Sequence, residues 1–344
     1  MPYSVKVGAH GVPSCVKQGE TVLDALLRDG VDYPHGCTTG VCGLCKSRVI
    51  AGEIELTQYY PSVLTDEERA AGLTLVCCAT PLADCMISPV QTDVLLPPVT
   101  SMSARISRIE RLTHDILRIG VSPRDDATFR FLAGQYASVS AEGLPAREFS
   151  MANRPGSGEL EFFIRRVPGG ALTGFLFGQA AVGQALAVAG PFGLAFLREG
   201  HIGPMLAVAG GSGLAPVLSI IQTALAHGMA QPIRLFVGVR AERDVYMERE
   251  LLALQASHPN LTSTFVLSDP EEGSRRPAGL MHEVLAKALA ADALGDTRAY
   301  VAGPPVMVEA VSKVLIGLGL PASACHADPF LTSADKISRG RVTE

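Results

Sequence analysis

Three cysteines stand close together near the start of this 344-residue chain, and a fourth follows at a distance. Cys37, Cys42 and Cys45 have the spacing C-x4-C-x2-C, and Cys77 comes 32 residues after the third of them. The short spacings put three sulfur atoms on one tight loop, while the fourth sulfur must return from another part of the fold. Glycines within the loop let its backbone N–H groups turn inward. The first part of the chain must therefore fold around converging thiols.

This spacing is typical of plant-type [2Fe–2S] ferredoxins, in which two bridged irons each take two sulfur ligands from the protein. A structural zinc site is the alternative, because Cys42 and Cys45 also form half of a zinc ribbon. A ribbon needs a second C-x2-C pair, and the chain has the adjacent Cys77 and Cys78 instead. We predict a [2Fe–2S] cluster on Cys37, Cys42, Cys45 and Cys77. Cys78 remains the alternative fourth ligand; on a strand over 74–78 it would point away from Cys77.

Composition favours an intracellular, multi-domain protein. With 47% hydrophobic residues, the chain is long enough for two or three domains, each with its own core. Its start has no signal-peptide pattern, and glycines and a proline interrupt the most hydrophobic stretch, 205–221. Eight cysteines in a chain of this length do not suggest a secreted disulfide scaffold. We therefore expect a cytoplasmic protein with no membrane association.

The negative charge is concentrated at one end of the chain. Residues 1–95 contain six Lys/Arg and eleven Asp/Glu, whereas the remaining residues contain 23 of each. An acidic electron-carrying module suits docking to a basic patch on a partner or on the rest of the chain, although ordinary solvated surface is the alternative. The chain has no basic run, so we expect no nucleic-acid binding.

Three segments with different patterns follow one another. A small β-rich module is expected over 1–95, with helices at 21–29 and from 65 to about 72, and a linker over 96–103. Six strand patterns between 104 and 192 predict an antiparallel barrel over 104–199, with one helix at 171–179. Alternating strands and helices predict a parallel α/β domain over 200–335. Residues 336–344 are expected to form a tail.

The expected barrel contains two motifs that suit a flavin. In Arg147-x-Phe149-Ser150, an arginine can bind phosphate, an aromatic ring can stack on a planar ring, and a hydroxyl can reach a ring nitrogen. In 165–173, glycines precede a helix whose first N–H groups can bind a diphosphate. The residues of this second motif that we expect at the flavin are Arg165, Val167, Gly169, Gly170 and Thr173.

The α/β segment opens with a strand, a glycine turn and a helix, an arrangement in which backbone amides can bind a pyrophosphate. Gly211, Ser212 and Gly213 form this turn, and Pro216 stands where the third glycine of the usual dinucleotide fingerprint would be. A second turn contains Gly303, Pro304 and Met307. Both turns are expected at the carboxyl edge of the sheet, where nucleotides bind. Arg240 and Asp244 are candidates for the adenosine end, or else an ordinary surface ion pair.

As a set, these motifs resemble the reductase components of bacterial aromatic ring-hydroxylating oxygenases, within the ferredoxin–NADP reductase superfamily. The resemblance covers residues 1 to about 330. It implies a β-grasp-type ferredoxin domain, a flavin barrel and a nicotinamide domain, with FAD as the flavin and NADH as the reductant. It also implies that Phe330 lies beside the flavin, although a final core strand would explain the same segment. Phe149 replaces the family's usual tyrosine, and Ala302 replaces a cysteine near the nicotinamide.

The resemblance implies a route for electrons. NADH gives a hydride to FAD, with Ser150 near flavin N5, and the cluster passes single electrons onward. The expected partner is a terminal Rieske oxygenase or an intermediate ferredoxin. A di-iron monooxygenase or a deoxysugar dehydratase is an alternative partner. A redox sensor without turnover is an alternative of another class.

Overall fold

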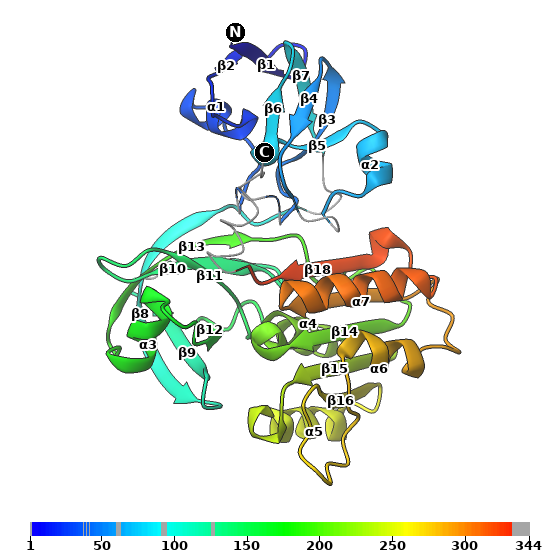
Figure 1. The fold of residues 1–344 in the computed structure, drawn as a ribbon. Helices are drawn as coiled ribbons and strands as arrows, with labels where there is room; N and C mark the ends of the chain where they lie inside the picture. The colour runs from blue at the N-terminus through cyan, green and yellow to red at the C-terminus, as the bar shows by residue number, and fades with distance from the viewer. Residues whose placement is uncertain are drawn as a thin grey trace. The chain divides into compact units, whose positions relative to one another are not determined.

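The computed structural model of the protein describes residues 2–36, 38, 40, 42–59, 63–90, 95–124 and 128–331. By its internal contacts it divides into two units, one within residues 1–95 and one comprising Leu96–Phe330 (Figure 1). The expected cluster ligand Cys37 and the expected tail, 336–344, lie outside the described residues. Within the described residues, no helix is long and apolar enough to cross a membrane.

The first unit is built on a five-stranded sheet with the order β2-β1-β7-β3-β5. β1 and β7 are parallel and the other neighbours are antiparallel. The helix α1 buries Val22, Leu23, Ala25 and Leu26 in the core of this unit, as the grasp-like fold requires. The strands are β1 (Tyr3–Val7), β2 (Ser14–Val16), β3 (Lys46–Ala51), β5 (Leu73–Leu75) and β7 (Cys85–Pro89), and the helix is α1 (Val22–Arg28).

Capping boxes begin both helices of this unit. The Thr21 side chain accepts a hydrogen bond from the Asp24 amide at α1, and the Thr65 side chain accepts one from Glu68 at α2 (Asp66–Ala70). These contacts satisfy N–H groups that would otherwise have no partner. A two-stranded sheet of β4 (Ile54–Leu56) and β6 (Ala79–Pro81) was not expected from the sequence.

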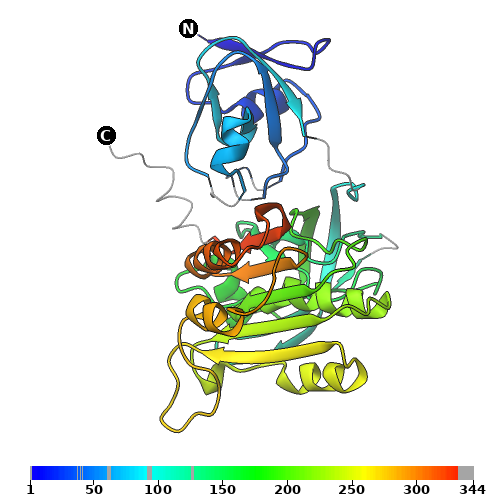
Figure 2. The same ribbon diagram turned by 90° about the vertical axis from the view of Figure 1, so that its right-hand side faces the viewer.

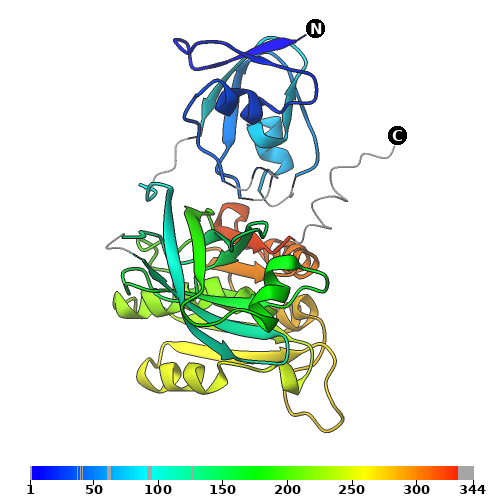
Figure 3. The ribbon, with the colours of Figure 1, turned by 90° about the vertical axis from the view of Figure 1, so that its left-hand side faces the viewer.

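The second unit starts with a six-stranded antiparallel sheet with the order β11-β10-β13-β8-β9-β12. A bridge between Met151 and Phe162 joins its two ends, so the sheet closes almost into the expected barrel (Figure 3). The first strand starts at Thr100, within the expected linker. The elements are β8 (Thr100–Arg111), β9 (Ile116–Pro123), β10 (Tyr136–Ser140), β11 (Arg147–Ser150), β12 (Leu160–Arg165), α3 (Ala171–Gly178) and β13 (Ala185–Phe192).

The rest of this unit is a parallel sheet with the order β16-β15-β14-β17-β18, and helices flank it (Figure 2). Strand order reverses between β14 and β17, which is where parallel α/β sheets bind ligands. β18 includes Asp328 and Pro329 of the segment that the sequence also explained as a final strand, and Phe330 follows it. The elements are β14 (Met205–Gly210), α4 (Leu214–Ala226), β15 (Ile233–Val239), α5 (Glu248–Ser257), β16 (Leu261–Leu267), α6 (Met281–Ala288), β17 (Arg298–Gly303), α7 (Pro305–Gly317) and β18 (Cys325–Pro329).

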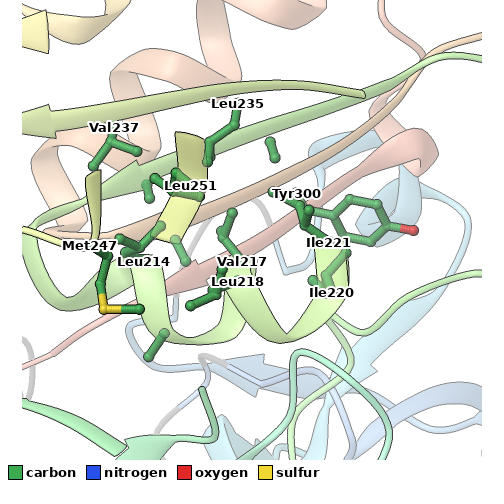
Figure 4. Close-up of a cluster of buried hydrophobic side chains, with 14 of the residues drawn as sticks. Leu214, Val217, Leu218, Ile220, Ile221, Leu235, Val237, Met247, Leu251 and Tyr300 are labelled. Carbon is green, nitrogen blue, oxygen red and sulfur yellow. The ribbon is translucent and has the colours of Figure 1, made fainter. Parts of the chain in front are cut away.

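A shared core joins the barrel to the parallel sheet. On α4, Leu214, Val217 and Leu218 pack with sheet residues such as Val237 (Figure 4). The same cluster includes the barrel residue Phe163, whose ring meets Tyr246 edge-on with centroids 5.7 Å apart. Burial of this apolar surface fixes the position of the barrel relative to the parallel sheet.

Candidate cofactor sites

In the first unit, the expected metal ligands lie among buried groups. Cys45 and Cys77 belong to its hydrophobic core, and Cys42 is partly buried. Gly40, on the ligand loop, has a φ of 73°, a conformation that glycine adopts readily. A Cβ atom added there would lie 2.7 Å from Cys78 Sγ and 2.8 Å from Tyr59 Cβ. The loop therefore depends on glycine to pack so tightly.

Cys77 and Cys78 lie differently from the expectation. The predicted strand 74–78 ends at Leu75, and a 3₁₀ turn, η1 (Val76–Cys78), carries both cysteines. Their Sγ atoms lie 3.6 Å apart. The expectation that Cys78 would point away from Cys77 was wrong, because a 3₁₀ turn does not alternate its side chains as a strand does.

A buried hydrogen-bond chain supports the ligand loop next to Cys45. The Tyr33 hydroxyl lies 2.6 Å from Ser47 Oγ, and Ser47 donates to the Cys45 carbonyl at 3.0 Å. Burial raises the pKa of Tyr33 to about 12, so this hydroxyl keeps its proton at neutral pH. Three described thiols, a tight glycine loop and a buried polar support fit an iron–sulfur cluster, which thiolates hold.

A cleft in the barrel contains several of the residues that we expected at the flavin. It is lined by Arg165, Arg166, the turn Val167–Gly170 and the start of α3. Thr173 lies beneath the turn, only 4% exposed. Its hydroxyl accepts a hydrogen bond from the Val167 amide at 3.2 Å. Thr173 therefore stabilises the turn from beneath, whereas the sequence placed it among the residues expected at the flavin.

The other flavin motif lies on β11. Arg147 and Phe149 share one face of this strand, and Ser150 points to the opposite face. Ser150 is buried, and its hydroxyl donates to Asp328 Oδ2 at 3.2 Å. Burial raises the pKa of Asp328 to about 7, although the hydrogen bond from Ser150 acts in the opposite direction. Sequence reasoning assigned no role to Asp328, because no local pattern links it to a strand 178 residues earlier.

A second cleft opens at the carboxyl edge of the parallel sheet, at the strand-order reversal. Its walls bring together five residues of the expected nucleotide set with groups from the barrel. The expected residues in this lining are Gly211, Arg240, Asp244, Pro304 and Met307, and the barrel supplies Asp115, Ile116 and Arg165.

The remaining expected nucleotide residues do not line this cleft. Gly213 and Pro216 are buried, and a Cβ atom at Gly213 would lie 2.2 Å from the Ala302 carbonyl oxygen. Gly303 is also tightly packed, since a Cβ atom there would lie 2.8 Å from the Gly210 carbonyl oxygen. These glycines let the two turns touch. Ser212 is only partly buried but is also absent from the lining.

Phe330 follows β18 directly. Its amide donates to the Gly303 carbonyl at 2.8 Å, and its side chain is partly buried against the shared core. The backbone contact fixes the end of the described chain beside the second glycine turn.

Arg165 stands where the two clefts meet. Its Nε donates to Asp115 at 2.7 Å, and both residues line both clefts. A Cβ atom on Gly211 would lie 3.2 Å from Arg165 Nη1, so the guanidinium lies over the glycine turn. Burial alone would raise the pKa of Asp115, but Arg165 holds it below the ordinary value.

The barrel contacts the cleft a second time through His114. Its Nδ1 lies 3.3 Å from Asp244 Oδ1, while Asp244 Oδ2 accepts from the Ala241 amide at 3.0 Å. Ligand atoms of His114, Asp115 and Asp244 lie within 4.8 Å of one another. A cation there would have to compete with Arg165, so an ion-pair network explains this cluster better than a metal site.

Comparisons with known proteins agree with this division of the chain. Family models match in three places: a 2Fe-2S iron-sulfur cluster binding domain at 9–82, an oxidoreductase FAD-binding domain at 103–196 and an oxidoreductase NAD-binding domain at 207–313. The ferredoxin–NAD(P)(+) reductase component of naphthalene 1,2-dioxygenase/salicylate 5-hydroxylase systems from Ralstonia sp. is 38% identical, covering 92% of this chain and 94% of the relative.

Other relatives serve different systems. The phenol 2-monooxygenase reductase component from a Pseudomonas species is 35% identical, covering 97% of this chain and 96% of the relative. The crystal structure of an Amycolatopsis cytochrome P450 reductase matches with a TM-score of 0.73 and 32% identity, covering 95% of this chain and 98% of that one. With three cofactor domains in the same order and full-length relatives of this kind, the chain belongs to the family of iron–sulfur flavoprotein reductase components of oxygenase systems and is an NADH-dependent oxidoreductase.

Proposed function

We propose that this reductase takes electrons from NADH and delivers them singly to a Rieske ring-hydroxylating oxygenase, directly or through a separate ferredoxin. When bound, FAD can accept a hydride, and the [2Fe–2S] cluster can transfer single electrons. The protein's own residues bind and align these groups. Cytoplasm, where thiols stay reduced, is the proposed compartment.

At the cluster, Cys37, Cys42, Cys45 and Cys77 are the proposed ligands. Cys45 gains a fixed position from the hydrogen bond between Ser47 and its carbonyl. Cys77 is buried and lies on a short 3₁₀ turn, so little motion of its thiol is available. Such restraint favours rapid electron exchange, because little rearrangement accompanies a change of charge.

At the flavin, Arg147 is proposed to bind phosphate, Phe149 to stack on the ring and Ser150 to approach N5. The turn Val167–Gly170 and the first amides of α3 would bind the diphosphate. The Ser150 hydroxyl already donates a hydrogen bond to Asp328, so a hydrogen bond from Ser150 to flavin would require this pair to open. If Asp328 is protonated, its carboxyl group can donate the hydrogen bond to Ser150. The Ser150 hydroxyl can then donate its own hydrogen bond to another acceptor.

At the nicotinamide cleft, the amides after β14 would meet the pyrophosphate, and Arg240 and Asp244 would meet the adenosine end. Arg165 is better suited to this pyrophosphate than to the flavin, because its guanidinium lies over Gly211. NADH binding would then draw on both the barrel and the parallel sheet.

The partner is proposed from the relatives. Two of the first relatives belong to naphthalene dioxygenase systems, which supports a ring-hydroxylating oxygenase. Relatives from phenol and propane monooxygenases, at 32–35% identity, make a monooxygenase the second candidate. The acidic first unit is suited to a partner with a basic docking patch.

The observation that best supports the proposal is the position of a nucleotide cleft and a flavin cleft on either side of Arg165 and Asp115. The Cys42→Ser variant tests the division of labour. It should lose the iron–sulfur absorbance and cytochrome c reduction but retain NADH-to-ferricyanide activity, which needs only the flavin. Loss of both activities in FAD-replete protein would contradict this order of electron carriers.

The partner can be tested with the purified wild-type reductase. Electron delivery from NADH to a Rieske ferredoxin or oxygenase, faster than to a di-iron hydroxylase, is the expected result. The reverse order would favour the monooxygenase reading.

A further inference from the structure

Cys78 is a thiol beside the cluster that the proposed ligand set does not use. It is 3% exposed, and its Sγ lies 3.6 Å from that of Cys77, within hydrogen-bond reach for two sulfur atoms. The 3₁₀ turn η1 directs both thiols into the same region of the core.

Cys78 also touches the loop that carries the other ligands. A Cβ atom on Gly40 would lie only 2.7 Å from Cys78 Sγ, so this sulfur packs directly against the loop backbone. The Cys78 thiol therefore packs against the ligand loop and also lies within reach of the proposed fourth ligand.

We propose that, in the cluster-loaded protein, Cys78 donates an S–H···S hydrogen bond to the Cys77 thiolate and thereby raises the reduction potential of the cluster. This inference rests on the proposed ligand role of Cys77. A liganding thiolate has no proton, so Cys78 must be the donor of the pair. Gain of an electron makes the cluster more negative, and a donor to a ligand sulfur stabilises that state more than the oxidised one.

Burial strengthens this effect, because no water competes for the donor at a site with so little exposure. Cys78 acts through Cys77 and is a positioning residue in this proposal. A higher potential would make the cluster a better acceptor of electrons from the flavin.

Cys85 provides a matched control in the same unit. It is also buried, but its thiol donates to the carbonyls of Glu53 and Ala83, at 3.2 and 3.0 Å. Cys85→Ala removes a buried thiol without removing a donor from Cys77.

The test is a reductive titration of the cluster in the FAD-containing full chain, with variants Cys78→Ala, Cys78→Val and Cys78→Ser. Alanine and valine should both lower the midpoint potential, by up to a tenfold change in the reduction equilibrium, which is about 59 mV for one electron. Valine fills most of the space of the thiol, so a shift with both variants is not due to a cavity. Serine keeps a donor and should stay nearer the wild type, and Cys85→Ala should leave the potential unchanged.

The proposal would be overturned by a wild-type potential in Cys78→Val, by an equal shift in all three variants, or by loss of iron from all three. A changed charge-transfer spectrum in Cys78→Ser, with none in Cys77→Ser, would make Cys78 the ligand and also overturn it. Iron and sulfide content of the wild type checks the proposed function separately, because absence of the cluster there would refute the ligand set itself.

Discussion

The Ser150 hydroxyl lies 3.2 Å from Asp328 Oδ2 and joins β11 of the barrel to β18 of the parallel sheet. Part of the Asp328 residue is exposed, but its carboxyl group is desolvated, and this burial raises its pKa to about 7. The bond therefore connects the motif expected at the flavin with a carboxyl group that titrates near neutral pH.

Asp328 should make stability depend on pH. The folded protein holds this proton more tightly than the unfolded chain, where the pKa is about 3.8. Its contribution is therefore fully present below about pH 4 and is lost as pH rises to about 7. At about 1.4 kcal/mol per pKa unit, this shift could contribute a few kcal/mol. The stability of Asp328→Asn should depend less on pH. Its melting temperature, relative to that of the wild type, should therefore rise between pH 5 and pH 8.

Ser150→Ala is the matched control for this pH effect. It removes the hydrogen bond that lowers the Asp328 pKa, so the loss of stability should extend to higher pH than in the wild type. Identical pH profiles of melting temperature for wild type and Asp328→Asn would contradict the raised pKa.

Arg165 and Arg166 should have separable roles although they are adjacent. Arg165 lines both clefts and lies over Gly211, whereas Arg166 lines only the flavin cleft and lies near the Phe177 ring. Arg165→Ala should raise the KM for NADH by at least about tenfold and leave FAD content near stoichiometric, since a charge-assisted hydrogen bond is worth roughly 1.5–3 kcal/mol. Steady-state kinetics and the flavin-to-protein absorbance ratio measure the two effects.

Arg166→Ala is the control for that experiment, and it should weaken FAD retention more than NADH binding. If Arg165→Ala releases FAD while its KM for NADH is unchanged, Arg165 binds the flavin and not NADH.

The sequence predicted these elements better than the contacts between them. Glycine turns and apolar strand runs are local, so both nucleotide turns were expected where the structure has them. Arg165 was expected at the flavin because its sequence neighbours are Val167 and Gly169. Its ion pair with Asp115 depends on the pairing of β9 with β12, which no local pattern specifies. The sequence did not predict the 3₁₀ turn at Cys77 for a different reason. Val76–Cys78 also has the composition of a strand.

Gly213 should be needed for packing rather than for ligand contact. A Cβ atom there would lie 2.2 Å from the Ala302 carbonyl oxygen, which is backbone and cannot rotate away. Gly213→Ala should cost at least about 1–3 kcal/mol of folding free energy, the usual range for overpacking. Denaturant unfolding of the second unit measures it. Gly295→Ala is the control, since a Cβ atom at Gly295 would meet no atom within 4 Å. Equal stability of both variants would contradict the close approach of the two turns.

Asp244 should favour NADH over NADPH. Its carboxylate is fixed by the Ala241 amide, lines the nucleotide cleft and lies close to Asp115. If the adenosine ribose binds beside Asp244, a hydroxyl can donate to the carboxylate, whereas the 2′-phosphate of NADPH would meet two negative groups.

Asp244→Asn removes one of these charges while keeping an oxygen that accepts from Ala241. It should lower the ratio of kcat/KM for NADH to that for NADPH by about tenfold, mainly through a better KM for NADPH. Arg240→Ala should move the ratio the other way, because this exposed cation is available to a phosphate. An unchanged ratio in Asp244→Asn, with both nucleotides still turned over, would place the adenosine end elsewhere in the cleft.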